Sequence, residues 1–367
     1  MNSPTDPGFV QLLTPDGRRV AHPDFAYPGD DASIAQHLRA MVLARRLDSE
    51  ATALQRKGQL ALWPPLLGQE AAQVGSVAAV GPRDEVIPSY RDHAVAIGMG
   101  VTPLELLRTF RGTDMVPWDS RALRCHLYSF VIGTQVLHAT GLAMGMRLDG
   151  MVGNPDPDAD GAAIVYFGDG ATSQGDVNEA FVFAASYTAP LVFFCQNNQY
   201  AISVPSETQS RIPLYRRASG FGIPGVRVDG NDVLAVQAVT AWALDRARRG
   251  QGPTFIEAFT YRMGAHTTSD DPTKYRERAE EASWRERDPI GRVRAYLRST
   301  GAIDDLWEGH LANEADALAE EVRAEVPALP DPDLADWFTR AYVRTPAGLL
   351  RQQAEFVAYE ASVEEIA

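Results

Sequence analysis

Cysteine is scarce in this sequence, with only Cys125 and Cys195 among 367 residues. Cys195 lies inside the apolar run at 191–195, where a strand would bury it. Two separated thiols form neither the disulfide framework of small secreted proteins nor a thiolate metal site. We therefore expect both cysteines to be free and the protein to work in the cytoplasm.

An excess of basic charge, a leader segment and long apolar stretches are also lacking. The chain has 34 basic residues against 48 acidic ones, which gives a net charge of −14. This balance argues against nucleic acid or an anionic membrane as a partner and would suit a basic docking surface on another protein. Residues 1–10 contain no basic region followed by an apolar stretch, so we expect no signal peptide. No apolar run reaches the length that spans a bilayer.

The apolar residues are instead arranged as in an α/β protein. Short apolar runs predict buried strands at 162–167, 191–195, 225–229 and 254–260. Periodic apolar residues predict intervening helices at 177–187 and 233–249, the first capped by Ser173 or Asp176. This alternation predicts a mostly parallel sheet with helices on both faces.

Three regions follow from the composition along the chain. Residues 1–32, rich in Pro, Gly and Asp, should form an extended N-terminal arm. Residues 33–282 should form the α/β domain, with added helices at 33–57 and 68–81. Residues 283–367 should form a C-terminal helical region packed on the same domain, with helices at 312–325 and 348–360.

Two polar motifs stand at the ends of neighbouring predicted strands: Gly168-Asp169-Gly170 and Asn197-Asn198. Glycines permit a sharp turn and a close approach to a ligand, and open α/β sheets bind ligands at the carboxyl ends of their strands. Asp169, the Asn198 side-chain oxygen and the Tyr200 carbonyl would suit Mg²⁺, which takes oxygen ligands and shares its shell with phosphate. Either motif alone would be an ordinary turn. Together, on one strand-helix-strand unit, they predict a metal-diphosphate site.

The paired motifs resemble the fingerprint of thiamine diphosphate enzymes. Their surroundings resemble the alpha subunit of the decarboxylating component of 2-oxoacid dehydrogenase complexes. The likeness covers most of the chain and includes the segments 68–75, 88–93, 132–135 and 261–271. It implies that residues 33–282 form a thiamine diphosphate-binding fold and that thiamine diphosphate and Mg²⁺ are the cofactors.

The resemblance also assigns roles within the site. Tyr90 and Arg91 would face the diphosphate, and the backbone near Ile132 would meet the aminopyrimidine. His266 would be catalytic, since an unperturbed pKa of about 6.5 suits proton transfer. The full set of implied cofactor contacts is Tyr90, Arg91, Ile132, Asp169, Gly170, Ala171, Asn198 and His266. Without the resemblance, Arg91 would be a surface arginine and His266 a solvated loop histidine.

Two further features concern the loops around this site. Ser129, Thr134 and Gln135 resemble the ligands of a structural potassium ion, because their neutral oxygens suit a large, weakly charged cation. Ordinary helix capping by Ser129 and Thr134 is the alternative. The loop after residue 260 would be tied down by Arg262, Tyr275 and Arg276.

Three positions depart from the family pattern or bear on regulation. Gln196 stands where branched-chain members often have an arginine, so one diphosphate contact is neutral here or supplied elsewhere. His126 could replace the histidine of the family's usual stretch near residues 121–128. Thr267 stands where animal relatives carry a regulatory phosphoserine, although a hydroxyl group alone does not establish phosphorylation.

The resemblance implies a reaction that needs partners. One α/β domain lacks room for the pyrimidine-binding half of the site, so a beta subunit would supply the activating glutamate in an α₂β₂ assembly. The reaction would be oxidative decarboxylation of a 2-oxoacid, followed by reductive acylation of a lipoyl group on the acyltransferase core. Residues 267–271 resemble the branched-chain subgroup, which favours 3-methyl-2-oxobutanoate dehydrogenase. A pyruvate dehydrogenase alpha subunit, a transketolase-like half enzyme and a non-catalytic regulatory paralogue remain alternatives.

Overall fold

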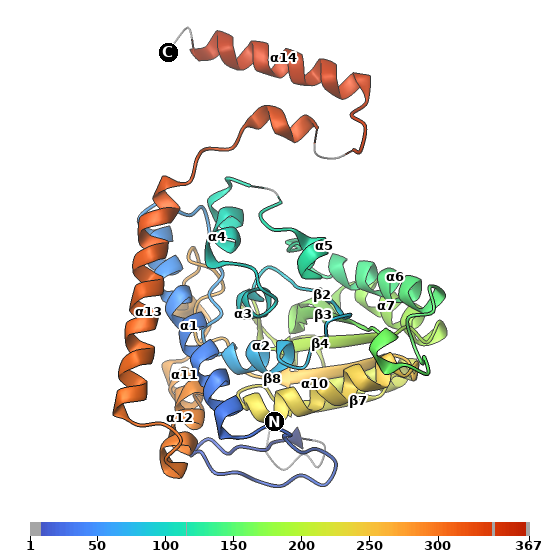
Figure 1. Ribbon diagram of the computed structural model, residues 1–367, viewed down its shortest axis with the longest axis vertical. Coiled ribbons are helices and arrows are strands. Elements are labelled where there is room, and N and C mark those ends of the chain that lie inside the picture. Colours follow the sequence, from blue (N-terminus) through green and yellow to red (C-terminus); the bar gives the residue numbers. More distant parts are fainter. Residues whose placement is uncertain (1–8, 115, 340–341, 365–367) are drawn as a thin grey trace.

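A computed structural model describes residues 9–114, 116–339 and 342–364 of the chain (Figure 1). At its centre is a six-stranded sheet whose neighbouring strands all pair in parallel, in the order β1-β7-β8-β4-β3-β2. The strands are β1 (Phe9–Val10), β2 (Glu85–Ile87), β3 (Ala163–Gly168), β4 (Leu191–Asn197), β7 (Gly225–Asp229) and β8 (Thr254–Phe259). The predicted parallel α/β fold is confirmed.

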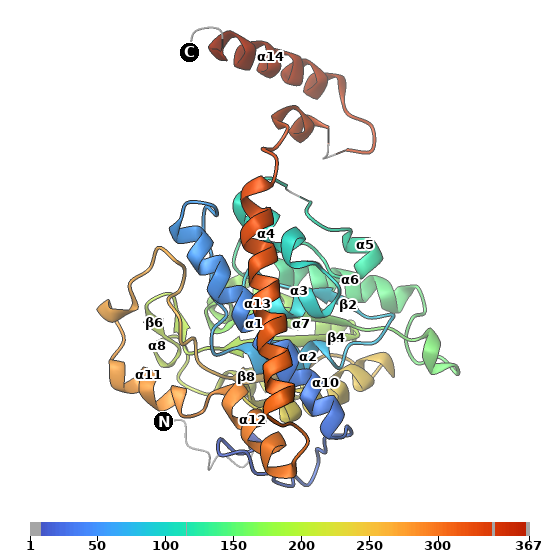
Figure 2. The ribbon, with the colours of Figure 1, turned by 60° about the vertical axis from the view of Figure 1, so that its left-hand side comes forward.

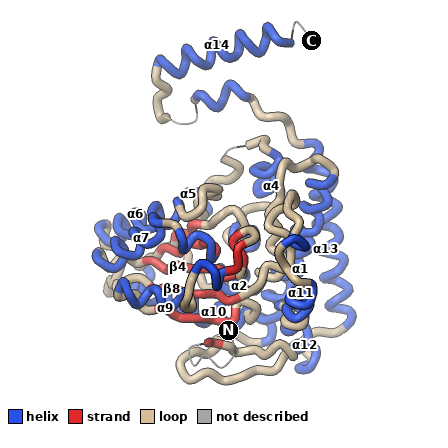
Figure 3. Tube along the Cα trace, turned by 180° about the vertical axis from the view of Figure 1, so that it is seen from behind, coloured by secondary structure: helices blue, strands red, loops and turns tan. Residues whose placement is uncertain are grey.

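Helices cover both faces of this sheet, so its strands are buried on both sides (Figure 3). Alternate side chains of a strand point to opposite faces. Ile164 and Tyr166 of β3 therefore join the core formed with α2 (Glu70–Val77) and α10 (Val233–Arg248). The other β3 side chains join the core formed with α6 (Thr134–Leu148) and α7 (Gly175–Ser186). Burial on both faces explains the continuous apolar runs in the sequence.

Longer helices surround the α2 side of the domain. The first helix, α1 (Asp31–Arg56), packs on α12 (Pro289–Thr300) and on α13 (Asp305–Glu325), which runs alongside it in Figure 2. The shorter helices are α3 (His93–Gly98), α4 (Pro103–Arg111), α5 (Ser120–Leu123), α8 (Ser206–Gln209), α9 (Leu214–Ala218) and α11 (Arg278–Arg285). A small hairpin pairs β5 (Tyr200–Ala201) with β6 (Val204–Pro205).

Two predicted helix starts differ from the structure. Neither Ser173 nor Asp176 caps α7, because Gln174 is its N-cap residue and makes no side-chain capping bond. The helix expected at 68–81 spans only Glu70–Val77. Gly68 cannot belong to it, since its φ is +94° and a Cβ there would lie 2.4 Å from the Tyr261 carbonyl oxygen. Glycine is therefore required where this turn meets the chain after β8.

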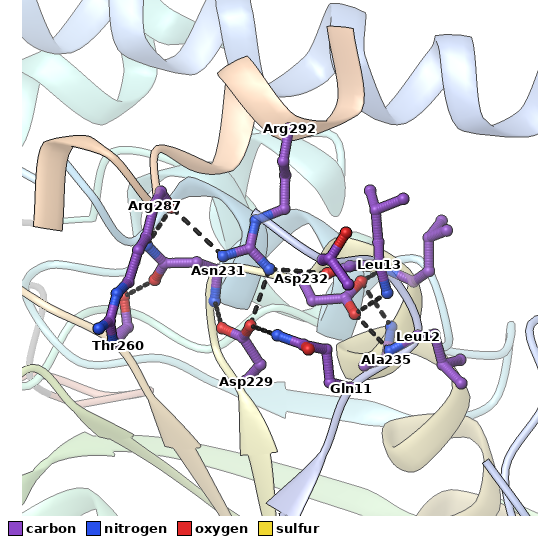
Figure 4. Close-up of polar contacts among 12 residues, drawn as sticks. Gln11, Leu12, Leu13, Asp229, Asn231, Asp232, Ala235, Thr260, Arg287 and Arg292 are labelled. Carbon is purple, nitrogen blue, oxygen red and sulfur yellow. Dashed lines mark hydrogen bonds and ion pairs between the residues drawn. The ribbon is translucent and has the colours of Figure 1, made fainter. Parts of the chain in front are cut away.

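Buried polar contacts attach the described part of the N-terminal arm to the domain (Figure 4). Asp232 Oδ2 accepts hydrogen bonds from the backbone N–H groups of Leu12 and Leu13, each at 2.6 Å. Arg292 Nη1 donates to Asp229 Oδ2 at 2.7 Å and to the Leu13 carbonyl at 3.0 Å. The arm is thus joined to the sheet through β1 and to the C-terminal helices through Arg292.

The last described helix, α14 (Ala347–Glu364), lies beyond the end of α13 and away from the sheet (Figure 1). Its main contacts are with a short 3₁₀ turn at Leu334–Phe338. The rings of Phe338 and Phe356 lie 5.6 Å apart there. The division into an arm, a domain and a C-terminal region stays a prediction. In the described ranges, no helix has the length and apolar character needed to cross a bilayer.

Candidate cofactor site

The carboxyl ends of four adjacent strands meet around one cavity of about 420 Å³. Every contact predicted for the cofactor lines this cavity: Tyr90, Arg91, Ile132, Asp169, Gly170, Ala171, Asn198 and His266. The strands β2, β3, β4 and β8 place these side chains, because Arg91, Asp169 and Asn198 each follow one strand and His266 follows the fourth. Parallel strands end at the same edge of a sheet, so residues far apart in the sequence converge there.

Asp169 is the carboxylate nearest the end of β3, and it is almost completely buried. Burial raises its pKa to about 6, although the positive charge of Arg262 acts in the opposite direction. Its Oδ2 accepts a hydrogen bond of 3.3 Å from Gln209. The next residue is closely packed, because a Cβ on Gly170 would lie 2.7 Å from the Ala201 side chain. The motif therefore presents a buried acid beside Gly170, where a larger residue would clash with Ala201, whereas Gly168 has open space around it.

Asn198 is held in one orientation by its neighbours. Its amide Nδ2 donates to Gln69 Oε1 at 3.0 Å, while its Oδ1 accepts from the Tyr200 N–H at 3.3 Å. The flanking residues Gln199 and Ile202 have φ angles of 73° and 55°, a region that costs energy for residues with a side chain. This turn brings Tyr200 to the cavity. The Tyr200 carbonyl oxygen accepts a hydrogen bond of 2.8 Å from Arg262 Nη1, and its second lone pair is left for another partner.

The donor set fits Mg²⁺ bound together with phosphate. Among the described residues, no three His, Cys, Asp or Glu side chains are grouped so that they could hold a metal ion. The candidate ligands are instead the Asp169 carboxylate, the Asn198 side-chain oxygen and the Tyr200 backbone carbonyl, from three residues that line the cavity. Mg²⁺ is commonly held by one or two carboxylates while phosphate and water complete its octahedron. These residues would therefore hold the metal only in company with a diphosphate.

Arg91 and His266 form one hydrogen-bonded unit in the lining of the same cavity. Arg91 Nη1 donates to the Pro65 carbonyl at 2.7 Å, and Nη2 donates to the His266 carbonyl at 2.8 Å and to His266 Nδ1 at 3.2 Å. Because a guanidinium group only donates, Nδ1 must be the acceptor. The neutral imidazole then carries its proton on Nε2.

The expected pKa of His266 is wrong for this structure. Burial, with the positive charges of Arg91 and Arg262, lowers the His266 pKa to about 3 from the usual 6.5. The sequence shows His266 only as a loop residue, and of the two cations Arg262 lies in the same segment while Arg91 comes from a distant one. His266 is therefore a neutral hydrogen-bond donor at pH 7, and an anionic ligand would raise its pKa.

The loop that carries His266 is tied down by its own polar residues. Asp270 Oδ2 accepts a hydrogen bond of 2.8 Å from the His266 backbone N–H and a short one from the Tyr275 hydroxyl. Arg262 Nη2 donates to the Tyr275 hydroxyl at 3.1 Å. Arg276 donates to the backbone carbonyls of Arg262, Met263 and Gly264. Arg262, Tyr275 and Arg276 thus have the anchoring roles predicted for them.

The charges of the cavity also fit a diphosphate. Arg91 and Arg262 are both buried, and within the described ranges their side-chain hydrogen bonds all go to neutral groups. Arg262 Nε has no hydrogen-bond partner there. Burial lowers the Arg262 pKa to about 10, and the positive charge of neighbouring Arg91 adds to this effect. Two buried cations with neutral partners are the arrangement that an anionic ligand stabilises.

Gln196 contacts an acid at the position where relatives often have an arginine. Its Nε2 donates a short hydrogen bond to Asp92 Oδ1, and its Oε1 accepts from Gln73 at 3.2 Å. Gln196 and Asp92 both line the cavity. Burial raises the Asp92 pKa to about 6. The second cation of the cavity is therefore Arg262, which the sequence suggested only as a loop anchor.

The potassium candidates are only partly brought together. Ser129 and Gln135 line the cavity, whereas Thr134 does not. Gln135 Nε2 donates to the Tyr166 carbonyl at 2.9 Å, and its buried Oε1 has no partner in the described chain. The alternative of capping is wrong, because Gly133 is the N-cap residue of α6 and no side chain caps it. An orphaned buried oxygen at Gln135 fits a cation ligand.

Other residues of the site were missed, or lie elsewhere than expected. Gln69 and Gln209 hold Asn198 and Asp169, and no sequence signal relates either glutamine to its partner. His126 does not line the cavity, and its Nε2 lies 3.2 Å from Glu85 Oε2. Both cysteines are free and buried, and the expected burial of Cys195 in its strand is confirmed.

Comparison with known proteins agrees with this geometry. The sequence pattern of the family described as "Dehydrogenase E1 component" matches residues 38–335. The 3-methyl-2-oxobutanoate dehydrogenase subunit alpha of Mycobacterium tuberculosis (strain ATCC 25618 / H37Rv) is 44% identical over 352 residues, which cover 94% of this chain and 92% of the relative. The pyruvate dehydrogenase E1 component subunit alpha of Bacillus subtilis (strain 168) is 37% identical, covering 93% and 90%. That of Bacillus cereus is 36% identical, covering 94% and 91%. The chain belongs to the dehydrogenase E1 component family.

Proposed function

We propose that this chain is the alpha subunit of a branched-chain 2-oxoacid dehydrogenase that uses magnesium thiamine diphosphate. With a beta subunit it oxidatively decarboxylates the 2-oxoacid and passes the acyl group to a lipoyl group on an acyltransferase core. The observation that carries the proposal is the convergence of Asp169, Asn198, Arg91 and His266 at the ends of four parallel strands. Family membership supports the same reading.

Each residue has a distinct task when the cofactor is bound. Asp169, Asn198 Oδ1 and the Tyr200 carbonyl would hold Mg²⁺, while Arg91 and Tyr90 would bind the diphosphate. Thiamine diphosphate supplies a nucleophile for the 2-oxo carbon and an electron sink for the loss of CO₂. His266 would donate a hydrogen bond from Nε2 to the diphosphate, whose negative charge would raise the His266 pKa so that the imidazole can take up and pass on a proton to an arriving lipoyl group.

The shape of the cavity supports a partner subunit. Its described lining includes the carboxylates of Asp92 and Asp169 but no glutamate that could engage an aminopyrimidine. Apolar side chains are exposed at its rim, since Phe130, Ile132 and Ile202 each keep about 40 to 55% of their surface in contact with solvent. Exposed apolar residues around a polar site mark a protein interface. A beta subunit in an α₂β₂ assembly would cover this rim and contribute the missing glutamate.

The substrate is proposed from the relatives. The M. tuberculosis protein is named for 3-methyl-2-oxobutanoate and is 44% identical, while the two Bacillus proteins are named for pyruvate and are 36 to 37% identical. The higher identity favours a branched 2-oxoacid, and pyruvate is the second candidate. The relatives named here are all 2-oxoacid dehydrogenase subunits, which counts against a transketolase-like half enzyme.

Two finer points belong to the same proposal. The unpartnered Gln135 oxygen, with Ser129 beside the cavity, supports a structural potassium ion. Free, buried cysteines support work in the cytoplasm.

The test is a steady-state assay of the chain co-expressed with its beta subunit. Pyruvate and the three branched 2-oxoacids are compared by kcat/KM, with and without magnesium and thiamine diphosphate. A cofactor-dependent preference for branched substrates is expected. Equal or better use of pyruvate would reassign the substrate, and no cofactor-dependent turnover would reject the function.

A further inference from the structure

The segment Trp63–Leu66 lies between helix α1 and the cofactor cavity and has no regular secondary structure of its own. One side chain of α1 holds it. Asp48 Oδ1 accepts a hydrogen bond of 2.8 Å from the Trp63 indole Nε1–H and one of 3.0 Å from the Leu66 backbone N–H. Trp63 is fully buried and Asp48 nearly so. The two hydrogen bonds fix both ends of a four-residue segment.

This segment is the support of the diphosphate-binding wall. The Pro65 carbonyl accepts a hydrogen bond of 2.7 Å from Arg91 Nη1. This bond is one of only three that orient the Arg91 guanidinium group in the described structure. The Pro64 carbonyl lies 3.0 Å from His93 Nε2, two residues after Arg91. The Arg91 guanidinium group and the His93 side chain just after it are therefore both held by carbonyls of this segment.

The same segment also supports the His266 loop. The Trp63 N–H donates to Thr268 Oγ1 at 3.2 Å, and the Thr268 N–H donates to the Trp63 carbonyl at 2.9 Å. Thr268 stands two residues after His266 in a loop without regular structure. Both diphosphate candidates, Arg91 and His266, are thus connected through Trp63–Leu66 to one carboxylate.

Stability does not explain an acid at this position. In the described ranges Asp48 forms no ion pair, and a buried carboxyl group without a cation is costly. Burial raises its pKa to about 7, and the negative charge of Glu70 adds to this effect. A carboxyl group such as Asp48, which destabilises the fold by its burial, is consistent with a functional role at the cofactor site.

We propose that Asp48 is a positioning residue for the cofactor diphosphate, acting through Trp63–Leu66 on Arg91 and on the His266 loop. The inference rests on the proposed function, because it assumes that the ligand between Arg91 and His266 is the diphosphate of thiamine diphosphate. The acceptor oxygen is the functional feature rather than the negative charge. Asparagine, which keeps that oxygen, should therefore replace aspartate while alanine should not.

The test measures binding of thiamine diphosphate with saturating magnesium by calorimetry, using the chain assembled with its beta subunit. Asp48→Ala should weaken affinity by about 10- to 100-fold, the loss seen when residues that orient direct ligands are removed. Asp48→Asn should bind thiamine diphosphate with an affinity within about threefold of wild type, a smaller change than the loss of one hydrogen bond would cause. Glu50→Gln is the matched control, because Glu50 is a buried acid of the same helix whose partners are Arg46 and Arg323.

A second measurement does not depend on the cofactor. Hydrogen exchange of the unliganded assembly is followed in peptides covering residues 62–68 and 264–270. Asp48→Ala should speed exchange in both peptides, since the Leu66 N–H loses its acceptor and the Thr268 N–H loses a fixed one. Asp48→Asn and Glu50→Gln should leave both unchanged.

The outcomes separate the inference from the function on which it rests. A wild-type assembly that does not bind thiamine diphosphate rejects the proposed function, and unchanged exchange at 264–270 in Asp48→Ala then rejects the positioning role as well. Wild-type affinity in Asp48→Ala, or equal losses in Asp48→Ala and Asp48→Asn, overturns the inference and leaves the function standing. If Asp48→Ala does not assemble, Trp63→Phe removes one donor but keeps a ring against His93. Its affinity should fall at least about threefold, and wild-type affinity would overturn the inference.

Discussion

Magnesium-dependent cofactor binding should fall steeply between pH 7 and pH 5, because Asp169 must be ionised to hold the metal. Burial raises the Asp169 pKa from 3.8 to about 6. A carboxyl group of pKa 6 is about nine-tenths ionised at pH 7 and about one-tenth ionised at pH 5. Since metal and proton compete for the same oxygen atoms, the apparent affinity should drop about tenfold over this range. An aspartate of ordinary pKa would change affinity by less than about a tenth.

Calorimetry of the chain assembled with its beta subunit can measure this slope, after correction for the affinity of magnesium for the free cofactor at each pH. Asp169→Asn should bind far more weakly at every pH and lose the slope. Asp92→Asn is the matched control, because Asp92 lines the same cavity, its pKa is also raised to about 6, and the proposal gives it no metal contact. A slope that survives Asp169→Asn but disappears in Asp92→Asn would refute the assignment of Asp169 as the metal ligand.

Three further outcomes are expected. The chain without its beta subunit should bind thiamine diphosphate poorly and show no decarboxylation, because its described cavity lining contains no glutamate; robust turnover by the purified chain would contradict this. His266→Ala should slow acyl transfer to lipoyl by about 100- to 10,000-fold while decarboxylation with an artificial electron acceptor falls less, and a lipoyl-dependent rate within about a factor of 3 of wild type would make the loop a lid only. Asp48→Asn should raise the melting temperature at pH 8 more than at pH 4. The pKa of Asp48 is raised to about 7, so the stability that the acid contributes is complete below about pH 4 and is lost as pH rises through 7; an equal effect at both pH values would contradict the assigned burial.

The part of the site that follows strands directly could be predicted from the sequence. Apolar runs located β3 and β4 to within two residues at either end, and the motifs after them necessarily lie at the carboxyl edge of a parallel sheet. The sequence alone therefore places Asp169 and Asn198 together. Arg91 and His266 needed the family resemblance, because a lone arginine or a lone loop histidine has no periodicity that marks its position.

What could not be predicted depends on contacts between distant segments. Gln69 orients Asn198 from a position 129 residues away in the chain, and no local pattern records that pairing. The pKa of His266 depends on Arg91 and Arg262, which follow different strands. The expected capping of α7 by Ser173 or Asp176 is wrong, as is the capping alternative at α6, because a polar residue near a helix start need not face its N–H groups. Sequence patterns fix where strands end, whereas orientation, protonation and support are set by packing.

The unpaired cations of the cavity relate cofactor binding to the stability of the fold. Arg262 is buried against the carbonyls of Tyr200 and Ile202, and its pKa is lowered to about 10. Burial, together with the charges of neighbouring Arg91 and Arg262, also keeps His266 neutral, with a pKa of about 3. A carboxylate beside either arginine would relieve this desolvation but would also compete with a diphosphate for the same donors. The chain instead holds its guanidinium groups with neutral carbonyls and with Asp48 acting at a distance through Trp63–Leu66. The electrostatic cost is then removed by the ligand, so cofactor binding should stabilise the folded state.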